Sequence, residues 1–86
     1  MDARARVAHN VRRLRVQAGL SQEDFAVDSG IDRTYVSRIE RGLENPTVAV
    51  LARIAKALNA DIVDLVLEPS SRSRVATLRP GRKPSR

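Results

Sequence analysis

Residues 19–42 read GLSQEDFAVDSGIDRTYVSRIERG and contain two helix starts separated by a single glycine. Ser21 stands where its hydroxyl can accept a hydrogen bond from the first turn of one helix, and Asp32 stands at the equivalent point of the next. Gly30 lies between them, where the missing Cβ suits a left-handed turn. The stretch therefore predicts two short helices that meet at a tight turn, at residues 21–29 and 32–41.

Helical spacing continues on both sides of this stretch. Upstream, Val7, Val11 and Leu14 recur at intervals of four and three residues, which places them on one face of a helix. Downstream, Thr47 can cap a further helix and Asp61 a last, very short one. No stretch alternates between apolar and polar residues as a strand would, so we expect an all-α fold. The predicted helices span residues 3–18, 21–29, 32–41, 47–58 and 61–67.

The length and composition of the chain exclude several classes of protein. Eighty-six residues leave room for one domain, and the absence of cysteine removes disulfides and thiolate metal sites. His9 has no second metal ligand nearby, so we expect no metal site. No apolar run approaches the roughly 18 residues of a membrane span, and the N-terminus has no signal-peptide core. We therefore expect a cytoplasmic protein without a cofactor that is not an enzyme.

The positive charge is concentrated near the C-terminus. The net charge is +6, but residues 1–67 hold ten basic groups against nine acidic ones. Residues 68–86 hold six basic groups against one acid and are rich in Ser, Arg, Pro and Gly. We expect a folded domain at 1–68 and a disordered basic tail at 69–86. The tail faintly resembles an AT-hook at 80–84, although general attraction to phosphates is the favoured interpretation.

The helix predicted at 32–41 has two distinct sides. At about 100° per residue, Val36 and Ile39 lie together on an apolar side. The opposite side suits major-groove reading, because Arg can donate twice to guanine and hydroxyls can donate or accept. Its residues are Thr34, Ser37, Arg38 and Arg41, and Arg33 projects from the first turn of the helix. Together with the preceding helix and the turn, this is the plan of a helix-turn-helix, although the same residues could be plain solvated positions.

Residues 10–67 resemble the phage-repressor/Cro-type helix-turn-helix regulators, also called xenobiotic-response-element-like. The matching segments are GLSQE at 19–23, Ala26, Gly30, VSRIERG at 36–42, NPT at 45–47 and IAKAL at 54–58. Within the family, the run from Asp32 to Ser37 is most similar to the controller proteins of restriction–modification systems, though Arg38 stands where these often have a small residue. The resemblance implies a five-helix lambda-repressor-like fold and sequence-specific binding of double-stranded DNA in transcription regulation, at the bacterial nucleoid.

The resemblance also implies roles for individual residues. Gln22 matches a position that anchors a backbone phosphate, and Arg41 and Asn45 match positions near the backbone. Tyr35 matches a position that touches DNA, although its angle on the helix also suits packing. Arg15 and Glu40 match a structural ion pair that joins the first helix to the third. The positions that face bases are Arg33, Thr34, Ser37 and Arg38.

The last predicted helix offers a seam for a homodimer on a palindromic operator. One recognition helix reads too few base pairs to find one site in a genome, so such domains commonly pair across a two-fold axis. The alternative is that the apolar residues of this helix all belong to the core. RNA polymerase would be a further partner of an activator, and a protein-interaction module such as an antitoxin or antirepressor is the competing function. The candidate seam residues are Ile62, Val63, Leu65, Val66 and Leu67.

Overall fold

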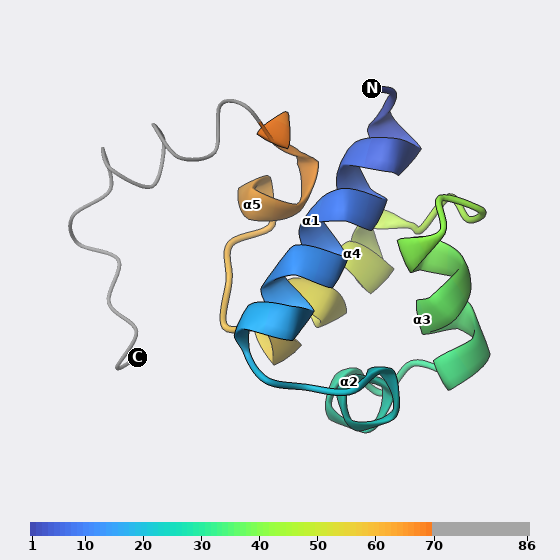
Figure 1. The fold of residues 1–86 in the computed structure, drawn as a ribbon, viewed down its shortest axis with the longest axis vertical. Coiled ribbons are helices and arrows are strands. Elements are labelled where there is room, and N and C mark those ends of the chain that lie inside the picture. The colour runs from blue at the N-terminus through green and yellow to red at the C-terminus, as the bar shows by residue number, and fades with distance from the viewer. Residues whose placement is uncertain (70–86) are drawn as a thin grey trace, which may run out of the picture.

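The computed structural model describes residues 1–69, which form helices joined by short loops (Figure 1). No strand occurs in this part of the chain, so the all-α prediction is confirmed. In Figure 1, α1 lies in front of α4, while α3 and α5 lie on opposite sides of the molecule. The basic tail predicted at 69–86 lies, from residue 70 on, outside the described residues. The helices are α1 (Ala3–Gln17), α2 (Gln22–Ser29), α3 (Arg33–Glu40), α4 (Val48–Ala57) and α5 (Val63–Val66).

Side-chain caps fix the starts of the first four helices. The Ser21 hydroxyl accepts from the Asp24 backbone N–H at 2.9 Å, and the Asp32 carboxylate accepts from the Thr34 N–H at 2.9 Å. Thr47 caps α4 in the same way, at 3.1 Å from the N–H of Val50. These three predicted caps are therefore confirmed. The cap of α1 is Asp2, whose carboxylate accepts from the N–H of Ala5 at 2.8 Å.

The fifth helix is shorter than the predicted span of 61–67. The Asp61 carboxylate accepts from the N–H of Val63 at 3.0 Å, and the Asp64 carboxylate accepts from the N–H of Asp61 at 3.0 Å. These reciprocal bonds satisfy one backbone donor ahead of the helix and one at its first residue, as a capping box does. Only the single turn Val63–Val66 is helical, and the backbone is extended at Leu67.

One hydrophobic core joins all five helices. Val11, Phe25, Val36, Ile54 and Leu65 have no exposed surface. In this core, α1 contacts α3 and α5, while α2 contacts α3 and α4. Burial of these apolar side chains is the main contribution to the stability of so small a domain.

The core position of Leu65 corrects its predicted place in a dimer seam. Its side chain is 0% exposed, whereas Val63 and Val66 on the same turn are 37% and 41% exposed. A fully buried side chain has no surface left for a second copy. The helix therefore divides its apolar residues between the core and the solvent.

A buried amide ties α5 to α1. The Asn10 side chain is 0% exposed, and its Nδ2 donates to the carbonyl oxygens of Leu65 and Leu67, at 2.9 Å each. These carbonyls lie at the end of a one-turn helix and have no partner within it. Asn10 thus supplies hydrogen bonds that so short a helix cannot provide for itself.

The arginines of α1 differ in their surroundings. Arg12 is exposed, but Arg13 is half-buried, and its Nε and Nη2 atoms are shielded from solvent. Burial lowers the pKa of Arg13, and the negative charge of Asp64 opposes this shift. Arg13 is thus part of the packing between α1 and α5 rather than of a solvated face. Within residues 1–69, no helix has the length and apolar character needed to cross a bilayer.

Candidate nucleic-acid interface

The turn between α2 and α3 is closed by backbone geometry. Gly30 ends α2 in the left-handed conformation, with φ of 69°, which an L side chain rarely adopts. The N–H of Ile31 then donates to the carbonyl of Ala26 at 3.1 Å, a 6→1 bond that belongs to the Schellman pattern. Ile31 itself is buried, so the turn is anchored in the core. This arrangement fixes the direction in which α3 leaves α2.

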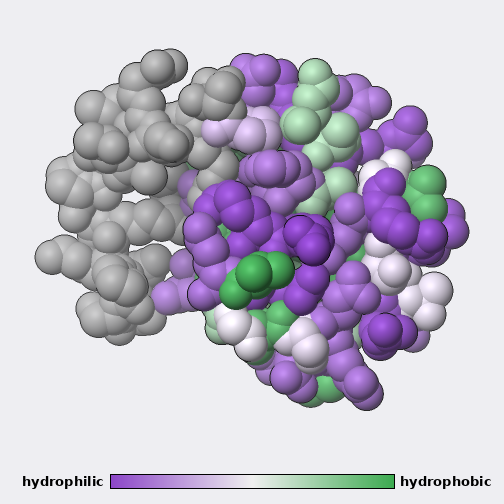
Figure 2. Space-filling model, in the orientation of Figure 1, coloured by the Kyte–Doolittle hydropathy of each residue, from purple (hydrophilic) through white to green (hydrophobic). Residues whose placement is uncertain are grey.

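The two predicted sides of α3 are present in the structure. Val36 and Ile39 are 0% and 2% exposed and hold the helix on the core. Arg33 and Thr34 at the start of the helix are exposed. On the side of the molecule where α3 lies, hydrophilic residues predominate at the surface (Figure 2). The helix therefore presents hydrogen-bonding side chains to solvent while its apolar side holds it in place.

Three other candidate residues of α3 are partly buried. Ser37 is half-buried, and Tyr35 packs in part against the hydrophobic core. Packing was one of the two roles considered for Tyr35 from the sequence. Arg38 is half-buried because it turns toward the loop that follows the helix, where its Nε donates to Oε2 of Glu44 at 2.5 Å.

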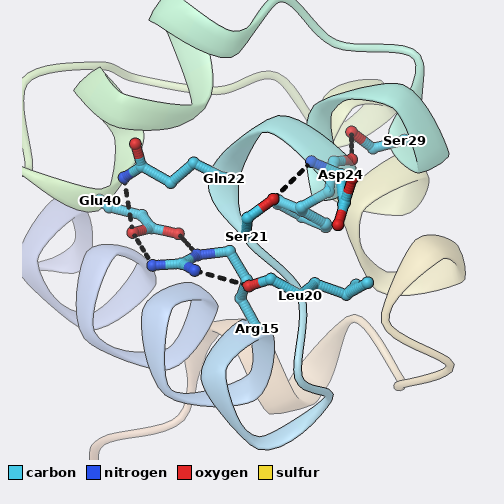
Figure 3. Close-up of polar contacts among 8 residues, drawn as sticks. Arg15, Leu20, Ser21, Gln22, Asp24, Ser29 and Glu40 are labelled. Atoms are coloured by element: carbon cyan, nitrogen blue, oxygen red, sulfur yellow. Dashed lines mark hydrogen bonds and ion pairs between the residues drawn. The ribbon is translucent and has the colours of Figure 1, made fainter.

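A polar network joins α3 to the first two helices (Figure 3). Arg15 donates through Nε to Oε2 of Glu40 at 2.7 Å and through Nη2 to Oε1 at 3.1 Å, so the ion pair is bidentate. Its Nη1 donates to the carbonyl of Leu20 at 2.7 Å. The side chains of Arg15 and Glu40 are only 11% and 4% exposed. The ion pair implied by the resemblance is therefore present, and each of the three guanidinium nitrogens donates a hydrogen bond.

Gln22 is the fourth member of this network. Its Nε2 donates to Oε1 of Glu40 at 3.1 Å, so the amide points toward the network (Figure 3). The resemblance implies that Gln22 anchors a backbone phosphate at the start of α2. In the structure this side chain also links α2 to α3. One carboxylate, Glu40, thus sets the position of α3 against two helices.

The loop after α3 holds the remaining candidates. Arg41 and Asn45 are both exposed, on either side of Gly42, which has a φ of 73°. The same loop carries Glu44, which no motif in the sequence singled out. The only signal in its favour was an acidic residue a short loop away from Arg38. Contacts of this kind depend on the path of the loop, which spacing alone does not give.

Residues 1–69 contain no group of three or more His, Cys, Asp or Glu side chains that could hold a metal ion. The candidate residues of α3 and of the loop that follows it carry hydrogen-bond donors and hydroxyls. Such groups bind phosphates and base edges, which take up hydrogen bonds without any chemical step.

Comparison with known sequences places the chain among helix-turn-helix proteins. The profile of the helix-turn-helix family HTH_3 matches residues 11–65. A hypothetical transcription factor of Neisseria meningitidis is 41% identical over 76 residues, which cover 88% of this chain and 72% of that protein. The control protein C.SmaI of Serratia marcescens is 42% identical over 66 residues, which cover 77% of this chain and 79% of that protein.

Solved structures show the same fold. The crystal structure of the hypothetical transcription factor NHTF from Neisseria matches with a TM-score of 0.82 and 40% identity, over 86% of this chain and 85% of that chain. The restriction–modification controller protein C.Esp1396I, solved as a tetramer with its natural 35 base-pair operator, matches with a TM-score of 0.69 and 31% identity. That match covers 79% of this chain and 99% of the controller. By this agreement of sequence, fold and site, the chain belongs to the helix-turn-helix family HTH_3.

Proposed function

We propose that the protein is a sequence-specific, double-stranded-DNA-binding transcriptional regulator that acts as a homodimer. The observation that carries this proposal is the exposed polar side of α3, held by the buried bidentate pair between Arg15 and Glu40. A helix that reads base edges must keep its angle in the groove, and a buried network of charge-assisted hydrogen bonds supplies that rigidity. The operator complex of C.Esp1396I, a protein of the same fold, supports the same conclusion.

Within this function, the candidate residues divide into two groups. The base-facing group consists of Arg33, Thr34, Ser37 and Arg38. Of its two arginines, Arg33 is the more exposed. Contacts with the DNA backbone come from Gln22, Arg41 and Asn45, with Tyr35 between the two groups. Phosphate contacts fix register, whereas base contacts carry sequence preference. The two groups are therefore distinguishable by experiment.

The first prediction compares one residue of each group. Arg33→Ala should weaken binding to the preferred operator by about 1–3 kcal/mol and relax preference at one base pair. Asn45→Ala should weaken binding to all duplexes by a similar factor, because phosphates carry no sequence information. Fluorescence anisotropy on the operator and on a scrambled duplex of equal length measures both effects. If Arg33→Ala leaves the ratio of the two affinities unchanged, the assignment of the recognition face is wrong.

The proposed seam consists of the residues in and next to α5 that the core leaves exposed or half-buried. Val63 and Val66 are exposed, and Ile62 and Leu67 are half-buried. Val66 also borders a shallow hollow whose lining includes Val7 and Leu51. The seam therefore combines the exposed valines of α5 with the partly buried Leu51 of α4. Contact across a two-fold axis places each of these residues near the same surface of the second copy.

The second prediction tests this seam. Val66→Asp should give a folded monomer, because two uncompensated carboxylates would be brought together and desolvated at the axis. The matched control is Val27→Asp. Val27 lies in α2 and is 76% exposed, so this variant should leave the dimer intact. Sedimentation equilibrium measures the masses. A wild-type protein that stays monomeric at high concentration and on its operator would contradict the dimer.

The remaining assignments follow from the same proposal. Binding and release of DNA need no cofactor and no covalent step, so the protein is not an enzyme. Its place is the cytoplasm, where DNA is accessible, with a DNA-binding domain at 1–68 and a basic tail at 69–86. The exposed arginine and threonine at the start of α3 favour DNA over the alternative of a protein-interaction module. An interaction-only version of the fold would not need these groups.

A further inference from the structure

Arg38 is held by the loop that follows its own helix. Its Nε donates to Oε2 of Glu44 at 2.5 Å, and its Nη2 lies 3.5 Å from the carbonyl oxygen of Leu43. Glu44 lies between α3 and α4, next to Asn45, the candidate phosphate contact. One edge of the guanidinium, formed by Nε and Nη2, is therefore directed at the loop and not at the solvent.

The same donor edge is one of those that arginine uses for nucleic-acid recognition. A guanidinium reads guanine by placing two parallel N–H groups on O6 and N7, which requires a fork of neighbouring donors. While Glu44 and Leu43 hold Nε and Nη2, that fork is occupied by the protein itself. A base contact through this edge therefore requires the ion pair to open.

The pair of Arg38 and Glu44 is accessible to solvent, which favours its opening. The side chains of Arg38 and Glu44 are 43% and 27% exposed, whereas those of Arg15 and Glu40 are 11% and 4% exposed. Solvent-accessible ion pairs contribute little to folding and are weakened by salt. The pair of Arg15 and Glu40 is thus a permanent part of the fold, and the pair of Arg38 and Glu44 is an exchangeable contact.

We propose that Glu44 is a specificity-determining residue that competes with DNA for Arg38. In the free protein, the carboxylate holds this edge of the guanidinium away from the bases that α3 would read. On a site with guanine at the matching position, two hydrogen bonds from Arg38 replace the ion pair. The inference rests on the proposed function, because Glu44 is given a role in controlling Arg38, one of the proposed base-reading side chains.

The test is a double-mutant cycle on operator affinity in the full-length chain. Glu44→Gln keeps the shape of the side chain and removes its charge. Any loss of a negative charge should raise the affinity for DNA somewhat. With Arg38 present, the gain in operator affinity should exceed that general gain by about two- to fivefold, the range expected for an exposed ion pair. In the Arg38→Ala background, Glu44→Gln should produce only that generic gain. The generic gain is given by Glu23→Gln, which removes an exposed carboxylate in the first turn of α2.

The probe is the duplex that the wild-type protein selects from a random pool, with a scrambled duplex beside it. The part of the gain that depends on Arg38 should decrease as salt is raised, because salt already weakens the ion pair in the wild-type protein. If Glu44→Gln raises operator affinity equally with Arg38 and with Arg38→Ala, Glu44 does not compete with DNA for Arg38, although the protein still recognises DNA. A lower operator affinity of Glu44→Gln would also contradict the proposal, because the ion pair would then orient Arg38 for DNA binding. Glu44→Ala repeats the test, and circular dichroism checks that each variant is folded.

The outcome also separates this inference from the proposed function. If the wild-type protein selects no sequence at all, the proposed function fails and the role of Glu44 fails with it. If the protein selects a sequence but Arg38→Ala leaves its affinity unchanged, Arg38 is no reader and competition for it is overturned. Only a gain that depends on both residues supports the proposal.

Discussion

Replacing Glu40 by alanine is expected to destabilise the domain by about 3–5 kcal/mol, the cost of breaking a buried ion pair from one side. In the wild type the Arg15 side chain is only 11% exposed, and the variant removes both of its carboxylate acceptors. It also removes the acceptor of the Gln22 amide. A domain of this size is stable by only a few kcal/mol, so a large part of the population should be unfolded. Urea denaturation followed by circular dichroism measures the loss.

The control for Glu40 removes both charges together. In the variant Arg15→Met with Glu40→Leu, no charge is left buried, so most of the lost stability should return. DNA affinity should not return with it, because the bonds that set the angle of α3 are still missing. If Glu40→Ala unfolds within about 1 kcal/mol of the wild type, well below the range for a buried pair, the network is not structural.

Replacing Leu65 by alanine is expected to destabilise the domain by about 2–5 kcal/mol, the range for a buried leucine that leaves a cavity. The side chain is 0% exposed, and its backbone carbonyl accepts from the buried amide of Asn10 at 2.9 Å. Loss of packing here should therefore loosen α5 from α1. Thermal and urea unfolding measure the change in the free energy of unfolding.

The neighbouring residue gives the matched control. Val66 is 41% exposed, so Val66→Ala should change the stability of the monomer by no more than about 0.5 kcal/mol. Both variants are compared at a protein concentration at which the dimer is dissociated, because dimerisation would add to the apparent stability. Equal and small effects at the two positions would contradict the division of α5 between core and surface.

Local chemistry explains why so much of the fold could be predicted. Ser21, Asp32 and Thr47 cap helices because their oxygens bond to N–H groups two or three residues away, a relation that the sequence contains in full. The apolar side of α3 follows from helical spacing in the same way, with Val36 and Ile39 in the core. Interactions of this range do not depend on how distant segments pack.

The features that were missed depend on contacts between distant parts of the chain. Asn10 bonds to Leu65, 55 residues away, and neither residue belongs to a recognisable motif. All apolar residues of α5 are similar in type, and one helical turn is too short for spacing to show which of them faces the core. Leu65 therefore lies in the core and not at the predicted seam. The contact of Arg38 with Glu44 depends on the path of a loop, which capping and periodicity do not determine.

Selection from random double-stranded DNA, followed by footprinting of the enriched duplex, tests the central claim most directly. The full-length protein should enrich one motif made of two related half-sites about one helical turn apart, and it should protect both of them. Arg33→Ala, carried through the same selection, should lose preference at one position in each half-site. A pool that remains random after repeated selection, with no protected sequence, would contradict sequence-specific recognition by α3.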